Sequence, residues 1–176
     1  MTTDILNDAA RAHYEKYWRI AREMFLVGDY ALAAFFSITL IEEVGKIGIL
    51  PDAIRGDAEA KKEFRNHPSK YVTAVGATLA VNSRVSRVYG RDEWRFAEWF
   101  RDEKLFLIRN SALYLELRGS DLVAPGEAID RGDSLLLVCI AGEVYAEIQG
   151  RQTGTGPTEW KRILSEIDAF RAANKS

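Results

Sequence analysis

The sequence has few of the residues that mark secreted, metal-binding or redox proteins. It contains one cysteine, two histidines and four prolines in 176 residues. The single cysteine, Cys139, excludes an intramolecular disulfide, and its apolar neighbours in the run Leu135–Ile140 predict a small buried side chain. The first residues, Met1–Asp4, do not form a basic segment followed by an apolar one, so we expect no secretion signal and a cytoplasmic protein.

A long apolar run and a large excess of one charge are also missing. The longest apolar stretch, Tyr30–Ile41, is about half of the ~20 residues that a membrane-spanning helix needs, and Glu42 and Glu43 follow it. We therefore expect no membrane association. The net charge of −2 gives no global attraction for nucleic acid, so any contact with RNA needs a local basic patch.

The apolar residues that are present recur at helical spacing. This pattern predicts an all-α fold, an up-and-down bundle of five to six helices without strands, formed by residues 1–176 as one domain. A second helix over 29–50 is apolar on all sides, as in the centre of a bundle, and Pro51 is expected to end it. The first helix carries an apolar stripe with alternating steps of four and three residues: Leu6, Ala10, His13, Tyr17, Ile20, Met24 and Val27.

Four more helices are expected after the central one. One begins at His67-Pro68, a long one follows Gly90 and extends to Leu115, and one starts at a cap at Asp133 or Ser134 and ends near Gln149. Residues 118–130 are expected to form a loop, and 150–157 a linker before the C-terminal helix. That helix places Trp160, Ile163, Leu164 and Ile167 on one face.

Three polar segments interrupt the apolar pattern, and the first lies in the central helix. Glu42, Glu43 and Lys46 occur in an apolar surface, where a buried charge is costly unless it is paired. Glu42 and Lys46 are four residues apart, which predicts an ion pair on one face. The pair either fixes helix packing, with Gly45 admitting a neighbouring backbone, or belongs to a polar site.

The other two segments concentrate cationic groups. Arg65, His67 and Lys70 form a set that can hold phosphate and move a proton, or alternatively a solvated start of a helix. Arg109 and Asn110 interrupt a later apolar helix, and Tyr114 follows five residues after Arg109. Five residues turn a helix by about 140° beyond one revolution, so Arg109 and Tyr114 meet one ligand only at a helix end or across two protomers.

These three segments, in this order, resemble the AbiV family of HEPN-type abortive-infection proteins over residues 20 to 130. That family has an apolar helix ending in Glu-Glu-x-Gly-Lys, then Phe-Arg-x-His-x-x-Lys, then an Arg before a Leu-Tyr-Val-Asp-like strip and a loop with proline. The counterparts here are Glu42-Glu43-Val44-Gly45-Lys46, Phe64-Arg65-Asn66-His67-Pro68-Ser69-Lys70, and Arg109 through Leu113-Tyr114-Leu115-Glu116 to Pro125.

The resemblance implies a HEPN-like bundle, a homodimer formed through the long helices, and a role in stopping phage multiplication. Many HEPN proteins are metal-independent ribonucleases with an Arg followed four to six residues later by His; here Arg109-Asn110 fits the first half and Tyr114 stands at the His position. We therefore consider RNA cleavage, RNA binding and capture of a phage or host protein. In the first case His67 is the expected base, and Arg65 or Arg109 the cation.

The sequence lacks the motifs of several other kinds of functional site. A di-iron bundle uses Glu-x-x-His pairs, and none occurs. The Cys/His spacing of a zinc site, the phosphate loop Gly-x4-Gly-Lys and the elbow Gly-x-Ser-x-Gly are also absent from the sequence. We expect neither a metal nor another cofactor.

Overall fold

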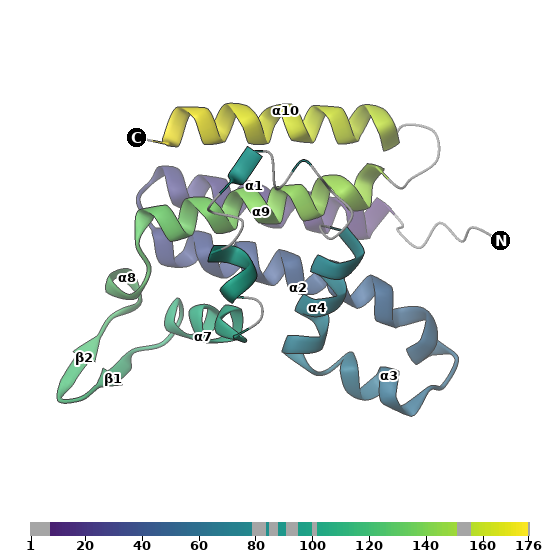
Figure 1. Ribbon diagram of the computed structural model, residues 1–176, viewed down its shortest axis with the longest axis horizontal. Coiled ribbons are helices and arrows are strands. Elements are labelled where there is room, and N and C mark those ends of the chain that lie inside the picture. Colours follow the sequence, from purple (N-terminus) through teal and green to yellow (C-terminus); the bar gives the residue numbers. More distant parts are fainter. Residues whose placement is uncertain are drawn as a thin grey trace.

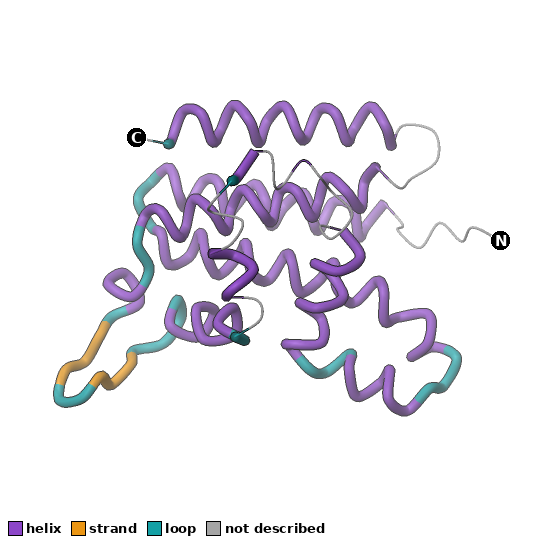
Figure 2. The backbone as a smooth tube through the Cα atoms, viewed as in Figure 1, coloured by secondary structure: helices purple, strands orange, loops and turns teal. Residues whose placement is uncertain are grey.

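The computed structural model describes residues 8–78, 84, 88–90, 95–99, 102–150 and 156–175. Figures 1 and 2 show a bundle of helices with one small hairpin, which confirms the all-α fold. The long helices are α1 (Asp8–Leu26), α2 (Tyr30–Ile54), α9 (Arg131–Gly150) and α10 (Gly156–Asn174). The shorter elements are α3 (Ala58–Glu63), α4 (His67–Thr78), α7 (Lys104–Ser111), β1 (Glu116–Arg118), β2 (Asp121–Val123) and α8 (Pro125–Ala128).

Helices α2 and α9 form the centre of the bundle. In Figure 1, α10 lies along one side, α1 and α9 come next, then α2, and the shorter helices α3, α4 and α7 lie on the opposite side with the hairpin. Helix α2 contacts α1, α4, α7 and α9, and α9 also contacts α10. The core consists mainly of branched aliphatic side chains from α2, α9 and α10, among them Ile38, Leu40, Ile41, Leu137, Ile140, Ile163 and Ile167.

Acidic and amide side chains begin several helices by accepting hydrogen bonds from free backbone N–H groups. Asp29 accepts from the backbone N–H of Leu32 at 3.0 Å, and Asp57 accepts from that of Ala60 at 2.8 Å. For α9 the residue that does this is Asp130, which accepts from Asp133 at 2.7 Å. The predicted cap at Asp133 or Ser134 is therefore wrong by one turn.

The buried face of α1 differs from the predicted stripe. Tyr14, Trp18, Ala21 and Phe25 are buried, whereas the predicted stripe is partly buried at Ala10, Tyr17, Ile20 and Met24 and exposed at His13 and Val27. Both sets have the same spacing of four and three residues and differ by one position, about 100° around the helix. Periodicity alone could therefore not decide which of the two faces is buried. Leu6, the first residue of the predicted stripe, lies outside the described residues.

The predicted long helix ending at Leu115 is also wrong. Glu103 has a left-handed backbone with φ of 55°, separating the helical residues 95–99 from α7, which ends at Ser111. Next come β1 and β2, antiparallel strands with Leu117 opposite Leu122, followed by the short α8. Strands of three residues are too short for an alternating pattern to be seen in the sequence. The expected loop over 118–130 is therefore partly structured.

The ends of two other helices need correction. Helix α2 does not stop at Pro51 but continues to Ile54, because a proline in the last turn removes only one hydrogen bond. Gly150 belongs to α9 and Gly156 to α10, so the predicted linker 150–157 shrinks to 151–155, which lie outside the described residues. Helix α10 packs against α9 of the same chain, with the expected apolar face inward. Within the described ranges, no helix is long and apolar enough to cross a membrane.

Gly45 lets α4 approach α2 closely. A Cβ atom at this position would lie 1.9 Å from the backbone oxygen of Lys70, a distance that no rotamer change can relieve. This confirms the interpretation that Gly45 admits a neighbouring backbone.

We predict that Gly45→Ala lowers the free energy of unfolding by roughly 1–3 kcal/mol, despite the better helix propensity of alanine, because the helices must separate. Urea unfolding measures this. Gly126→Ala is the matched control, since a Cβ there meets nothing within 4 Å, and it should be nearly neutral. Equal stability of the two variants would contradict the close approach.

Candidate functional site

The carboxylate of Glu42 is the point at which α2, α4 and α7 meet. Lys70 donates a hydrogen bond to Oε1 at 2.6 Å, and His67 Nδ1 lies 2.8 Å from Oε2. Arg109 Nε lies 3.8 Å from the same Oε2, and the hydroxyl of Tyr71 donates to it at 3.5 Å. One carboxylate therefore gathers groups from all three of the polar segments. We call these five residues the Glu42 cluster.

The contacts of His67 and Arg109 with Glu42 are less well aligned than the hydrogen bond of Lys70. Both Nδ1 of His67 and Nε of Arg109 are buried without a well-aligned acceptor in the described structure. The distances of 2.8 and 3.8 Å still allow strong attraction by a buried carboxylate. Such partners can be displaced more easily than Lys70, whose hydrogen bond is well aligned.

The cluster has a closed side and an open side. The side chains of Glu42 and Lys70 are 6% and 5% exposed, whereas those of Arg109 and His67 are 22% and 35% exposed. Lys70 neutralises the carboxylate inside the bundle. Arg109, and His67 when protonated, thus add positive charge at the edge that solvent reaches.

Two opposing effects set the pKa of Glu42. Burial raises it, but the hydrogen bonds and charges of Lys70 and His67 outweigh burial, so the net pKa lies below its ordinary value. Burial likewise raises the pKa of Tyr71, helped by the negative charge of Glu42. At neutral pH the cluster therefore contains a carboxylate and a neutral phenol.

Aromatic rings flank Arg109 and His67, the two outer side chains of the cluster. The guanidinium of Arg109 lies 5.3 Å from the centre of the Phe35 ring, and the His67 ring lies 5.4 Å from that of Phe106. Cations over aromatic faces gain about 0.5–1 kcal/mol in exposed positions. These rings hold Arg109 and His67 in place without occupying their hydrogen-bonding atoms.

Not every predicted residue joins the cluster. Arg65 and Tyr114 are exposed, Asn110 is partly buried in the last turn of α7, and none of the three has an observed contact with Glu42. Lys46 pairs with Glu43, three residues earlier, at 2.5 Å and not with Glu42, so the expected Glu42–Lys46 pair is wrong. Burial explains the difference, because Lys70 reaches the buried Glu42 from α4.

Sequence analysis missed Tyr71 and a second buried carboxylate. Glu143 on α9 is fully buried; Arg84 Nε contacts both of its oxygens at 3.2 Å, and Tyr89 donates at 2.9 Å. Arg84 also donates to Asp168 on α10 at 2.7 Å. An acidic residue within the apolar run of α9 was the available signal. This group links Arg84 to α9 and α10, and Tyr89 to α9.

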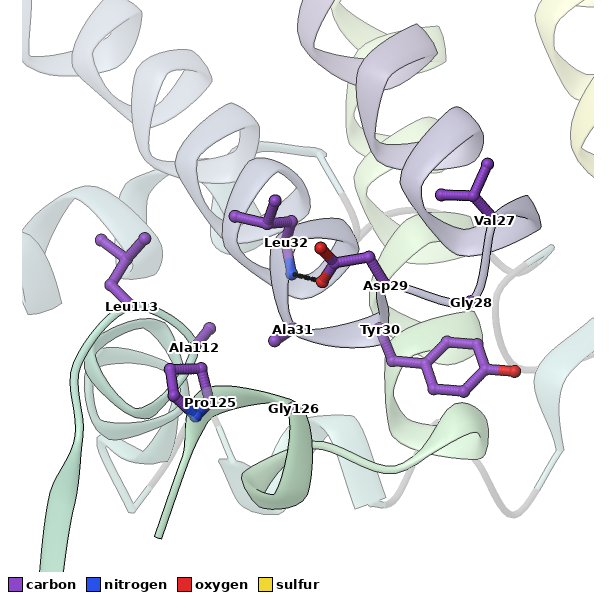
Figure 3. Close-up of a pocket in the computed structure, with 10 residues that line it drawn as sticks. All are labelled: Val27, Gly28, Asp29, Tyr30, Ala31, Leu32, Ala112, Leu113, Pro125 and Gly126. Atoms are coloured by element: carbon purple, nitrogen blue, oxygen red, sulfur yellow. Dashed lines mark hydrogen bonds between the residues drawn. The ribbon is translucent and has the colours of Figure 1, made fainter. Parts of the chain in front are cut away.

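An open pocket of about 560 Å³ lies near the start of α2 (Figure 3). One side is the turn from Val27 to Leu32, where Asp29 caps the helix, and the other side contains Leu113 and Pro125. The walls of the pocket are largely apolar and backbone, so the titratable groups of the cluster remain the better candidate for chemistry.

Metal binding finds no support in the geometry. Across the described ranges, no three His, Cys, Asp or Glu side chains gather closely enough to hold a metal ion. Cys139 is buried, as expected, and burial raises the pKa of its thiol to about 12.

Comparison with known proteins identifies the family of this chain. A family model described as AbiV, of HEPN type, matches residues 5–146. The chain belongs to the AbiV family. The match is wider than the polar segments and includes α1, α2 and most of α9, which makes this AbiV chain an abortive-infection protein of HEPN type in general terms. No curated protein and no solved structure matches it.

We predict that Glu42→Gln in this AbiV protein lowers the free energy of unfolding at neutral pH by about 3–5 kcal/mol, because Lys70 remains buried without a counter-charge. A lowered pKa means that the carboxylate stabilises the fold above its unfolded pKa of about 4.3 and that this stabilisation is lost as pH falls through the folded pKa. Urea unfolding at neutral and acidic pH should therefore show a smaller difference between wild type and variant in acid.

Glu59→Gln is the control, because Glu59 pairs with Lys62 on the surface, with 71% and 75% of the side chains exposed. It should cost less than about 1 kcal/mol at either pH. A similar small cost for Glu42→Gln would show that the buried pair does not stabilise the bundle.

Proposed function

We propose that the protein is an abortive-infection effector that acts on RNA at the Glu42 cluster, by binding it or by metal-independent cleavage. The observation that carries this proposal is the charge arrangement: the one carboxylate is neutralised internally by Lys70, and Arg109 and His67 reach the surface. This is the local positive patch that RNA needs on a protein of net charge −2.

The same geometry suits cleavage of the phosphodiester. His67 presents Nδ1 to Glu42, which leaves Nε2 as the nitrogen that a ligand reaches. In the proposed reaction Nε2 takes the proton of a ribose 2′-hydroxyl, the 2′-oxygen bonds to phosphorus, and the bond to the 5′-oxygen breaks, with water protonating the leaving oxygen. Arg109 stabilises the negative charge of the phosphorane, and Glu42 stabilises the imidazolium.

We further propose that the protein works as a homodimer, as membership of a HEPN family implies. A second copy would place another Arg109 and His67 across a shared cleft and double the positive charge offered to RNA. The molecular mass in solution, measured by analytical ultracentrifugation, tests this proposal, and a monomer at micromolar concentration contradicts it.

We predict that Arg109→Ala weakens binding of single-stranded RNA and reduces the slope of log affinity against log salt by roughly 0.7, the value for one lost phosphate contact. His67→Ala should leave most of the binding but lower cleavage in EDTA by about 10²–10⁴-fold, because the general base is lost. Fluorescence anisotropy and gel electrophoresis of a labelled RNA measure the two effects.

Arg19→Ala is the matched control, since the Arg19 side chain on α1 is 67% exposed and lies 4.0 Å from Glu23, on the same surface of the helix. Unchanged cleavage in His67→Ala would remove His67 as the base. Wild-type protein that neither binds nor cuts RNA would remove the proposal itself.

A second candidate function has its own observation. Tyr114, Leu115, Leu117 and Leu122 on and before the hairpin are 61–73% exposed, an unusual concentration of large apolar side chains on one short element. Such a surface suits capture of a phage or host protein by a non-enzymatic interaction module. Tyr114, which stands at the position of the HEPN His, belongs to this hairpin surface and not to the Glu42 cluster.

We predict that replacing Leu117 and Leu122 by Ser changes the free energy of unfolding by less than about 1 kcal/mol, because both side chains are exposed. If the hairpin surface captures a protein, this variant loses protection of host cells against phage while RNA binding by the Glu42 cluster is unchanged. Plaque counts and RNA anisotropy on the same variant measure this. Full protection by the variant would exclude the hairpin surface as the functional contact.

A further inference from the structure

A line of aromatic rings extends from the Glu42 cluster to the surface of α1. The guanidinium of Arg109 lies over the Phe35 ring, and the centre of that ring lies 5.3 Å from the centre of the Phe36 ring. Phe36 lies 5.9 Å from Tyr17, and Tyr17 lies 4.3 Å from His13. The two histidines of the sequence thus stand at opposite ends of one connected series of contacts.

The rings are fixed on one side and open on the other. Phe35, Phe36 and Tyr17 are partly buried and pack against the core, while His13 is exposed. Neighbouring rings are inclined to one another by 41–71°, so each offers its own face rather than stacking on the next. Rigid, separately oriented rings suit the stacking of unpaired bases.

The charges beside the rings favour a polyanion over a protein surface. Arg109 borders the line at one end, and Glu42 and Glu43, the carboxylates next to it on α2, are each already paired with a lysine. The line therefore combines flat apolar faces with a cation that can bind phosphate. A protein partner would contact the apolar faces of these rings but would not need the charge of Arg109.

We propose that His13, Tyr17, Phe36 and Phe35 form a stacking track for the bases of single-stranded RNA, with Arg109 holding a backbone phosphate at its inner end. This inference rests on the proposed RNA function and adds the class of RNA: unpaired strands, since bases inside a duplex cannot reach the rings. The track leads the strand toward His67, which lies against the same Glu42 oxygen as Arg109.

The test compares two labelled probes of about ten nucleotides, within the range of roughly 4–16 that single-strand binding modules cover: an oligoadenylate and an abasic oligomer with the same phosphates. Wild-type protein should bind the oligoadenylate more tightly. His13→Ala, Tyr17→Leu and Phe36→Leu should each weaken oligoadenylate binding roughly tenfold and leave the abasic probe unaffected, because only stacking is removed. Leu keeps the packing volume on the core side.

Tyr30→Leu is the matched control, since Tyr30 is another partly buried ring of α2 that contacts Phe25 instead of the track. It should bind both probes as wild type does. Binding of both probes with equal affinity, or track variants that bind like Tyr30→Leu, would overturn the track while leaving RNA action at the Glu42 cluster intact. No binding of either probe would remove the RNA function and the track with it.

A second copy of the chain is the alternative occupant of these rings. If Tyr17→Leu and Phe36→Leu turn a dimer into a monomer in analytical ultracentrifugation, the rings form a contact between copies and the track is wrong. The expected result is an unchanged mass for all three variants. His13→Ala is the sharpest of them, because an exposed side chain can be removed without disturbing the core.

Discussion

The burial of one carboxylate, Glu42, constrains much of this fold. A charge that is 6% exposed in the middle of the bundle must be paired, and the chain meets this need from two other helices. Helix α4 supplies Lys70 and His67, and α7 supplies Arg109. Gly45 belongs to the same constraint, since Lys70 reaches Glu42 only if its backbone comes close to α2. The positions of α4 and α7 on α2 thus follow largely from satisfying a single charge.

The Glu42 cluster supplies more positive charge than the carboxylate requires. Lys70 alone would balance the carboxylate, and a purely structural pair would be cheaper to bury than a group of five charged or titratable side chains. Arg109 and His67, the side chains beyond this pair, are the more exposed ones, and an aromatic ring lies beside each. By contrast, Glu143 is fully buried, and Arg84 and Tyr89, which bind it, are only 15% and 4% exposed. An edge that solvent reaches thus distinguishes the Glu42 cluster, as a candidate site, from the structural group around Glu143.

The sequence was sufficient for the helical class and the central helix, because apolar residues recur at helical spacing and one helix is apolar on all sides. The sequence did not predict which residue pairs with Glu42. The rule for residues four apart favoured Glu42 with Lys46, but that rule describes helix surfaces, and burial gave Glu42 to the distant Lys70. Tyr71 was missed because a tyrosine in an apolar pattern carries no mark of a hydrogen bond. The hairpin and the left-handed Glu103 were missed because both depend on local backbone geometry rather than periodicity.

The Arg…His pattern of HEPN ribonucleases is absent along the chain but has a counterpart in space. Tyr114 occupies the sequence position of the His, and it lies on the hairpin surface with 62% of its area exposed. The imidazole that does stand beside Arg109 is His67, from α4, and both approach the same oxygen of Glu42, at 3.8 and 2.8 Å. A phosphate that replaced the attraction of Glu42 for these two groups would meet a cation and a proton acceptor together. Arg109 lies 3.8 Å from Glu42 without an aligned hydrogen bond, and Lys70 already neutralises that carboxylate, so a phosphate can contact Arg109 with little rearrangement of the cluster.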